Sequence, residues 1–303
     1  MEQFKGTRFK RSDWGELRWI LPFVLPAFAL IALVILYPFG LAMYYSLTDY
    51  NLMRPLSRSF VGLGNYLEIL RSGYFWDSLW KTTYFTLLSV GLEFVLGLWA
   101  AVFLNKKFRG RGFLRALIIL PWALPTVVNG MMWQWIFDAN YGALNGLLSQ
   151  LGFIKHYVIW LGEPFMALNS VIVADVWKNF SFIALLLLAG LQTIPAELYE
   201  AATMDGASGW RRFWKVTFPL LKPSILVALV LRTIEAFKVF DIIYMMTKGG
   251  PADGTQVLSF YIYRESFQFL HLGFGAALSF MVSVGILILA VVYIKGLYTE
   301  VEY

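Results

Sequence analysis

Ionisable side chains occur inside two long apolar stretches of this sequence. Asp175, Lys178 and Asn179 are three and four residues apart, so they project from one face of a helix. An ionisable group within a membrane span costs roughly 2.5 to 3.5 kcal/mol and normally faces a bundle interior or a wet cavity. The spacing predicts a polar site between membrane helices, with a structural ion pair between two helices as the alternative.

A second charged set follows in the stretch at 217–246. It consists of Arg232, Glu235, Lys238 and Asp241. Each step of three residues turns the helix face back by about 60°, so these four would sweep about half of the circumference of a continuous helix. We therefore expect that they cannot all line one cavity, and that Arg232 pairs with Glu235 and Lys238 with Asp241.

The two sets together carry three basic and three acidic side chains. Balanced donors and acceptors suit a neutral polyhydroxyl ligand, because each hydroxyl can both donate and accept. A dedicated phosphate site is expected to be net positive. The balance favours an oligosaccharide over glycerol phosphate.

Two further side chains stand out in neighbouring apolar stretches. Trp122, between Pro121 and Pro125, lies too far from the ends of its apolar stretch to be a simple anchor at the membrane interface. We expect it either to stack on a sugar ring or to pack between helices. Glu93 is the one acid in its stretch, where it either forms hydrogen bonds in the bundle interior or contacts substrate. Prolines at i, i+4 predict kinks in the first and third stretches.

The elements that must position these residues are membrane helices. The chain has 303 residues, 59% of them hydrophobic, and a mean hydropathy of +0.63, which excludes an ordinary soluble protein. A span needs roughly 20 apolar residues. Six stretches qualify, and they predict an all-α polytopic fold: 19–47, 79–104, 112–137, 166–192, 217–246 and 269–296.

The placement of positive charge predicts the orientation. Of 25 Lys and Arg residues, 15 fall in the N-terminal tail, the 105–115 loop, the insert near 211–222 and the C-terminal tail, and 6 fall in the opposite loops. By the positive-inside rule, both termini and the insert are cytoplasmic. We expect a cytoplasmic tail at 1–18, a permease domain at 19–296 with a cytoplasmic loop at 197–219, and a tail at 297–303. This distribution argues against a nucleic-acid partner.

The insert predicts two short helices joined by a turn. Pro195 and Glu197 suit the first turn of one helix, and Gly206 suits its end. Ser208 can cap the second helix, and Pro219 is expected to end it. The pair would lie on the lipid surface or dock to another protein.

The same insert resembles the EAA loop of ATP-binding-cassette importer permeases. The resemblance rests on Glu-Ala-Ala at 200–202, Gly206 after three intervening residues, and Val-Thr-Phe-Pro at 216–219, where the family usually has Ile-x-Leu-Pro. In that family this loop is the coupling helix held in a cleft of the cytoplasmic ATPase. The resemblance therefore implies that ATPase coupling falls on Glu200, Ala201, Ala202, Asp205, Gly206 and Ala207.

Two other segments resemble carbohydrate permeases of the maltose/trehalose type. They are Phe60-Val-Gly-Leu-Gly-Asn-Tyr66 and Thr247-Lys-Gly-Gly-Pro251. The resemblance implies the six-span, maltose-type permease fold and a sugar site near the midplane, with Asp241 in a structural role. The implied site, with Trp122 added, comprises Trp122, Asp175, Lys178, Asn179, Phe182, Arg232, Glu235, Lys238 and Val239.

The resemblance also implies the partners. They are a second related permease subunit, two ATPase subunits that bind ATP and Mg, an extracytoplasmic sugar-binding protein and the lipid of a prokaryotic plasma (inner) membrane. This chain has no P-loop, no His-Glu-x-x-His and no cysteine, so we expect no cofactor, metal or enzymatic activity of its own. The expected function is import of a sugar such as trehalose or maltose. The alternatives are an ion-coupled secondary transporter, a glycerol-phosphate importer permease and a membrane transferase enzyme.

Overall fold

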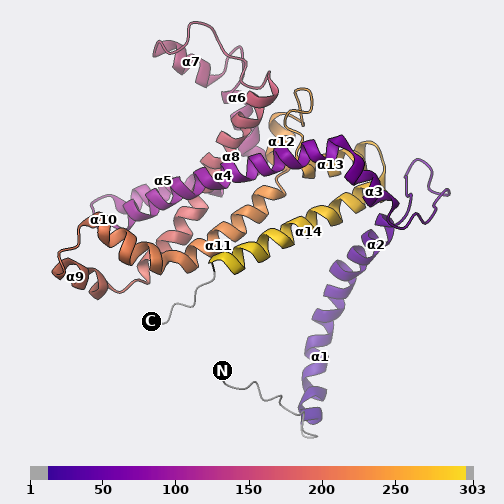
Figure 1. The fold of residues 1–303 in the computed structure, drawn as a ribbon, viewed down its shortest axis with the longest axis horizontal. Helices are drawn as coiled ribbons and strands as arrows, with labels where there is room; N and C mark the ends of the chain where they lie inside the picture. The colour runs from indigo at the N-terminus through magenta and orange to yellow at the C-terminus, as the bar shows by residue number, and fades with distance from the viewer. Residues whose placement is uncertain (1–12, 298–303) are drawn as a thin grey trace.

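The computed structural model describes residues 13–297, and over this range the chain is helical (Figure 1). No strand occurs there, only isolated bridges that join Thr48 to Phe60 and Asn51 to His271. The all-α expectation is therefore confirmed for this part. The tails were predicted at 1–18 and 297–303, and most of their residues lie outside the described range. Within that range, α1 already begins at Asp13, inside the predicted N-terminal tail.

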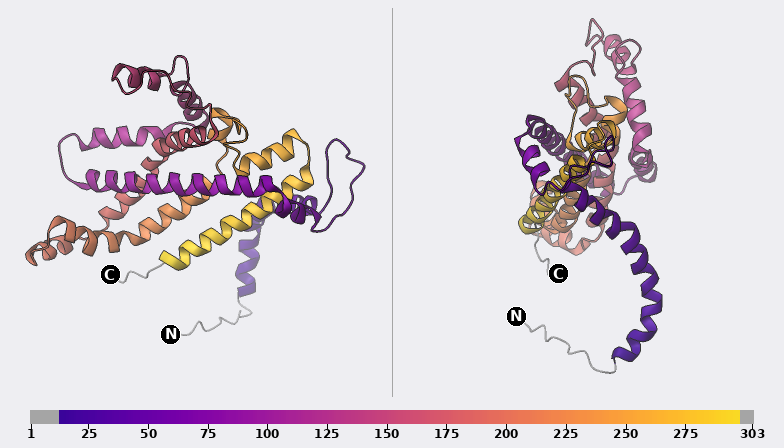
Figure 2. Two further views of the ribbon diagram at one scale, coloured as in Figure 1. Left: turned by 45° about the horizontal axis from the view of Figure 1, so that its top comes forward. Right: turned by 90° about the vertical axis from the view of Figure 1, so that its right-hand side faces the viewer.

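One long helical segment opens the described chain. It comprises α1 (Asp13–Ile31), a π-helical turn (Ala32–Leu36) and α2 (Tyr37–Ser46). Pro22 and Pro26 lie inside α1. The most apolar part of this segment is not buried against the rest of the chain. Both views of Figure 2 show α1 leading away from the other helices.

The bundle is organised around two long helices, α4 (Gly73–Asn105) and α8 (Pro164–Gln192), which lie against each other along their lengths. A Cβ on Gly97 would come within 2.8 Å of Ile183 Cγ2, so glycine permits the close approach of these helices. A third helix, α11 (Phe218–Phe237), lies against both, and α14 (Leu272–Leu297) covers α11. The Ala101, Leu187 and Leu221 side chains are fully buried where α4, α8 and α11 meet.

The third apolar stretch is sharply bent. It forms α5 (Arg111–Ala123) and α6 (Thr126–Ile136), which meet at 95°. The break falls at Leu124 and Pro125, where a proline disfavours helical geometry in the residue before it. The kink predicted for this stretch is confirmed.

The stretch at 217–246 is not one helix. Helix α11 ends at Phe237, and a new helix, α12 (Asp241–Met246), starts after three intervening residues. The expected end at Pro219 is also wrong. The short α10 (Gly209–Arg212) continues through a π-helical turn (Phe213–Thr217) into α11, and Pro219 occupies the first turn of α11, where a missing N–H is tolerated.

The remaining helices are short. They are α3 (Gly64–Arg71), α7 (Ala143–Gln150), α9 (Ala196–Met204), α13 (Leu258–Tyr263) and a π-helical turn (Arg264–Gln268). Figure 1 shows α9 and α10 at the same end of the bundle as the start of α5, with α3 at the opposite end.

Four described helices are long and apolar enough to cross a membrane, and the bent α5–α6 pair adds a fifth. The four are Pro22–Ser46, Gly73–Asn105, Pro164–Gln192 and Leu272–Tyr293. Helix α11 has 20 residues but carries Lys222, Arg232 and Glu235. These charges lower its apolar character, so length and composition support four or five spans rather than the six expected.

Candidate functional site

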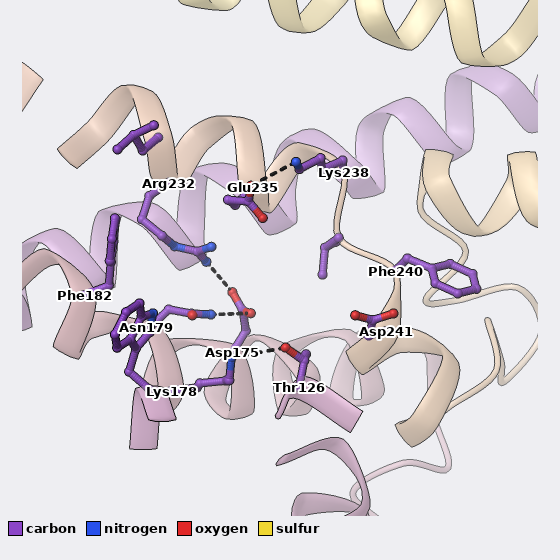
Figure 3. Close-up of a pocket in the computed structure, with 13 residues that line it drawn as sticks. Thr126, Asp175, Lys178, Asn179, Phe182, Arg232, Glu235, Lys238, Phe240 and Asp241 are labelled. Atoms are coloured by element: carbon purple, nitrogen blue, oxygen red, sulfur yellow. Dashed lines mark hydrogen bonds and ion pairs between the residues drawn. The ribbon is translucent and has the colours of Figure 1, made fainter. Parts of the chain in front are cut away.

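A cavity of about 580 Å³ lies where the α5–α6 break faces α8 and the α11–α12 break (Figure 3). The structure brings all nine of the sequence-derived site residues to its wall. It adds four that the sequence reasoning did not include: Thr126, Leu231, Phe240 and Asp241. Thr126 directly follows the α5–α6 break, and Phe240 lies in the α11–α12 break. Helical periodicity therefore could not predict that these two residues line the cavity.

Arg232 holds a buried ionic cluster at one side of the cavity. Its Nε lies 2.6 Å from Oε2 of Glu93, its Nη2 2.7 Å from Oε1 of Glu93, and the same Nη2 2.8 Å from Oδ2 of Asp175. All three side chains are almost completely buried. The guanidinium thus joins α4, α8 and α11. The expected pairing of Arg232 with Glu235 is wrong, because Arg232 points to the two helices packed against it.

Asp175, Lys178 and Asn179 share one face of α8, as their spacing predicts. Asn179 Nδ2 donates to Asp175 Oδ1 at 2.8 Å. Lys178 Nζ instead crosses to Oγ1 of Thr126 at 3.1 Å, at the start of α6. The carboxylate of Asp175 is therefore held from two sides, by Arg232 and Asn179, while Lys178 connects α8 to the α5–α6 break.

The second ion pair of the cavity is exposed. Lys238 Nζ lies 2.9 Å from Oε1 of Glu235, and the two side chains are 52% and 60% exposed. The expected pairing of Lys238 with Asp241 is wrong, because α11 stops before Lys238 and the chain turns away from its helical path. The same break overturns the expectation that the four charged residues of this stretch cannot share a cavity: Arg232, Glu235, Lys238 and Asp241 all line it.

Aromatic side chains complete the wall. Trp122 and Phe182 stack with their ring centres 5.8 Å apart and their planes at 29°, and Trp122 is 44% exposed. Figure 3 shows Phe182 and Asn179 at one side of the cavity and Phe240 and Asp241 at the other. Among residues 13–297, no three His, Asp or Glu side chains converge in the manner of a metal site.

A second candidate site is the turn between α9 and α10. The N–H of Gly206 bonds to the carbonyl of Thr203 at 3.0 Å and that of Ala207 to the carbonyl of Ala202 at 2.9 Å, which closes the helix end with Gly206 at a φ of +72°. The backbone N–H of Arg211 donates to Oγ of Ser208 at 3.4 Å. The predicted stop at Gly206 and cap at Ser208 are confirmed.

The residues expected to couple to an ATPase surround this turn. Glu200, Ala201, Asp205 and Gly206 are exposed, whereas Ala202 and Ala207 are half-buried. The turn is held to its own chain by two side-chain contacts: Arg212 donates to Thr203 Oγ1 at 2.7 Å, and the hydroxyls of Tyr199 and Thr217 lie 3.1 Å apart. It is therefore a fixed projection that presents Glu200 and Gly206 to solvent.

Comparison with known proteins places the chain in a defined group. Residues 93–294 match the family described as binding-protein-dependent transport system inner membrane component. The trehalose/maltose transport system permease protein of Thermococcus litoralis is 43% identical over 288 residues, 95% of each chain. The sulfoquinovosyl glycerol transport system permease protein of Agrobacterium fabrum is 39% identical over 95% of this chain and 93% of its own.

A solved structure shares the fold. A chain in the crystal structure of a bacterial ABC transporter that imports the acidic polysaccharide alginate superposes with a TM-score of 0.82, over 94% of this chain and 98% of that one, at 23% identity. The helical arrangement described above is therefore the arrangement of an ABC importer permease.

Proposed function

Because this chain belongs to the family of binding-protein-dependent transport system inner membrane components, we propose that its charged cavity is part of a path for a neutral sugar. A permease subunit of this family is a membrane component of an ABC importer and not an enzyme. The observation that carries the proposal is the composition of the cavity wall. Six charged side chains, three acidic and three basic, line it beside a stacked aromatic pair.

The charge of the cavity favours a neutral ligand. The wall carries three carboxylates (Asp175, Glu235, Asp241) and three cations (Lys178, Arg232, Lys238). This balance disfavours a phosphate or sulfonate, which would need a net positive site. Trp122 and Phe182 offer apolar faces on which a sugar ring can stack. The volume falls within the roughly 300 to 1,000 Å³ of small-molecule sites.

The substrate of this proposal is a disaccharide or oligosaccharide such as trehalose or maltose. The trehalose/maltose permease of Thermococcus litoralis, similar over 95% of both chains, supports this choice. The relative from Agrobacterium fabrum, whose name gives sulfoquinovosyl glycerol, makes an anionic sugar the second candidate. The two differ in charge, and the equal numbers of acidic and basic side chains in the cavity favour the neutral sugar in this proposal.

Energy would come from partner subunits. In this proposal two ATPase subunits bind ATP and Mg and hold the α9–α10 turn through Glu200, Ala201, Ala202, Asp205, Gly206 and Ala207, and a second permease subunit completes the path. An extracytoplasmic binding protein delivers the sugar. Helix α11 serves as the sixth span, with Arg232 and Glu235 turned toward the cavity, and both termini face the cytoplasm of a prokaryotic cell.

The test is uptake of labelled trehalose into liposomes that contain the full complex, with the ATPase, second permease and binding protein added or omitted in turn. We expect uptake to require ATP and every partner, and to be unaffected when the proton gradient is collapsed. Uptake by this chain alone, or uptake lost with the proton gradient while ATP is maintained, would instead establish an ion-coupled transporter. Preferential uptake of glycerol 3-phosphate or a sulfonated sugar would identify an anionic substrate.

A further inference from the structure

We propose that Ser259 of α13 is a positioning residue for the cavity: its hydroxyl holds the α11–α12 break, from which Val239 and Asp241 reach the cavity wall. Ser259 itself does not line the cavity. The inference rests on the proposed function. It also gives a role to the Thr247–Pro251 segment, which the cavity does not use.

The α11–α12 break leaves a backbone carbonyl that neither helix satisfies. In a continuous helix the carbonyl of Val239 would accept a hydrogen bond from the N–H four residues later. Among the described residues no backbone N–H donates to it, and the hydroxyl of Ser259 does so instead. A carbonyl left unpaired inside a protein is costly, so this bond stabilises the break in its present geometry.

Ser259 is held in turn by α4. Helix α13 begins one residue before it, at Leu258, whose N–H donates to Oγ1 of Thr82 at 2.8 Å. The Leu258 and Thr82 side chains are almost completely buried. The Thr82 hydroxyl donates to the carbonyl of Ser78 at 2.7 Å, which leaves its oxygen free to accept from α13. Ser259 therefore ties the break to α4 and not to the helix that ends there.

The loop between α12 and α13 is closed on itself. Thr255 is fully buried; its Oγ1 donates to the carbonyl of Gly250 at 2.9 Å and lies 2.6 Å from Oγ1 of Thr247. Three non-glycine residues have positive φ angles of 52°, 45° and 57°: Lys248, Ala252 and Asp253. Such conformations persist only where the surroundings over-determine them, so the loop gives α13 little freedom to move.

Charged contacts attach the same loop to its neighbours. Arg264, which directly follows α13, donates to Oδ1 of Asp253 at 2.7 Å and also to Oε1 of Gln256. From α4, Lys81 donates to the backbone carbonyl of Asp253 at 2.9 Å. A shift of α13 would have to break these bonds together, which makes α13 a fixed support for the break.

Two kinds of contact join α13 to the break. The ring of Phe240 lies against α13, with its centre 5.1 Å from that of Tyr263. This contact between rings is less directional than a hydrogen bond, so it retains the segment without fixing its backbone. The bond from Ser259 is the directional contact. A binding site needs its groups placed within about 0.5 Å, so loss of this bond should weaken sugar binding although no cavity side chain is removed.

The experiment combines hydrogen exchange, followed by mass spectrometry, with equilibrium dialysis of labelled trehalose. Both use the purified complex without the binding protein, whose own affinity for sugar would mask the cavity. Ser259→Ala should accelerate amide exchange at 238–244 and raise Kd roughly twofold to tenfold. Ser259→Thr keeps the hydroxyl and should restore both values.

Ser279→Ala is the matched control. Ser279 is half-buried like Ser259, and its Oγ donates to the carbonyl of Gly275 at 2.9 Å, within α14. The variant loses the same kind of bond without touching the break, so we expect neither faster exchange at 238–244 nor a raised Kd.

The two readouts decide the inference in separate ways. Faster exchange at 238–244 together with a raised Kd, both restored by Ser259→Thr, supports it. Unchanged exchange shows that the bond does not hold the break, and faster exchange at an unchanged Kd shows that the break does not position the cavity. Either of these results overturns the inference and leaves the proposed function standing.

The exchange measurement needs no sugar. If the unmodified complex neither binds nor takes up trehalose, the proposed substrate is wrong, and exchange at 238–244 still decides whether Ser259 holds the break. Should Ser259→Ala fail to assemble, Ser259→Cys keeps nearly the same size with a much weaker donor. Faster exchange in that variant then supports the inference, and unchanged exchange contradicts it.

Discussion

At the residue scale, the Glu93–Arg232–Asp175 cluster decides how the cavity is built. The guanidinium donates to carboxylates on two other helices, at 2.6 to 2.8 Å. Buried ion pairs tolerate the loss of one partner poorly, because the remaining charge has no water to solvate it. The cluster therefore serves as a joint between α4, α8 and α11.

Arg232→Ala should destabilise the protein by about 3 to 5 kcal/mol, since two buried carboxylates lose their shared cation. The measurement is the melting temperature of the detergent-solubilised protein, together with the amount recovered from the membrane. Lys238→Ala is the matched control, because its exposed pair is worth about 0 to 1 kcal/mol. Equal melting temperatures for the two variants would show that the cluster does not hold the helices together.

Trp122→Ala should weaken sugar binding without affecting assembly. Aromatic stacking contributes about 0.5 to 1.5 kcal/mol, which corresponds to a roughly 2- to 10-fold rise in Kd. Equilibrium dialysis of labelled trehalose against the purified complex measures it, and Trp122→Phe, which keeps an aromatic face, is the control. If Trp122→Ala binds normally, the stack with Phe182 is only a packing contact.

At the scale of elements, two interruptions of helical structure create the site. The bend between α5 and α6 brings Trp122 and Thr126 to the cavity, and the gap between α11 and α12 brings Asp241. A third interruption, at Gly206, creates the projecting turn between α9 and α10. In each case some of the candidate-site residues lie at or next to a helix end.

Gly206→Trp should reduce both ATP-dependent uptake and co-purification of the ATPase. A side chain other than glycine is strained at a φ of +72°, by about 1 to 2 kcal/mol, and a Cβ added there meets no other atom within 4 Å. The bulk of tryptophan would therefore project outward, where we propose that the ATPase binds. Gly206→Asn is the control, because asparagine tolerates this conformation. Unimpaired uptake by Gly206→Trp would contradict the docking role.

At the scale of the whole molecule, the distribution of charge sets the orientation in the membrane. The Lys- and Arg-rich loop before α5 lies at the same end of the bundle as α9 and α10 (Figure 1). From the positive-inside rule, which acts on such clusters, we expect this end to face the cytoplasm. The N-terminal apolar helix, which is not buried within the chain, has its hydrophobic surface available to lipid or to another subunit.

The absence of cysteine allows a direct test of orientation. We expect Lys155→Cys, in the segment between α7 and α8, to react with a membrane-impermeant maleimide on intact cells. Lys107→Cys, in the loop before α5, should react only after the membrane is opened, because the positive-inside rule predicts that the basic loop is cytoplasmic. The opposite pattern would invert the whole topology and place the α9–α10 turn outside, out of reach of an ATPase.

The sequence by itself determined the features that depend on neighbours along the chain. Apolar length predicted helices, Gly206 and Ser208 predicted a helix end and a cap, and the spacing of Asp175, Lys178 and Asn179 predicted a shared face. Each of these is a local property, since it follows from helical periodicity or from backbone preferences within a few residues.

Only the tertiary structure decided which charges pair and which remain available. Glu93 and Arg232 are 139 residues apart, and their contact depends on how α4 and α11 cross, which no spacing encodes. The break after Phe237 was likewise not predicted from the sequence, and it brings Asp241 to the wall of the cavity. The sequence therefore identified the charged residues of the cavity, but their roles depended on contacts between helices that are distant in sequence.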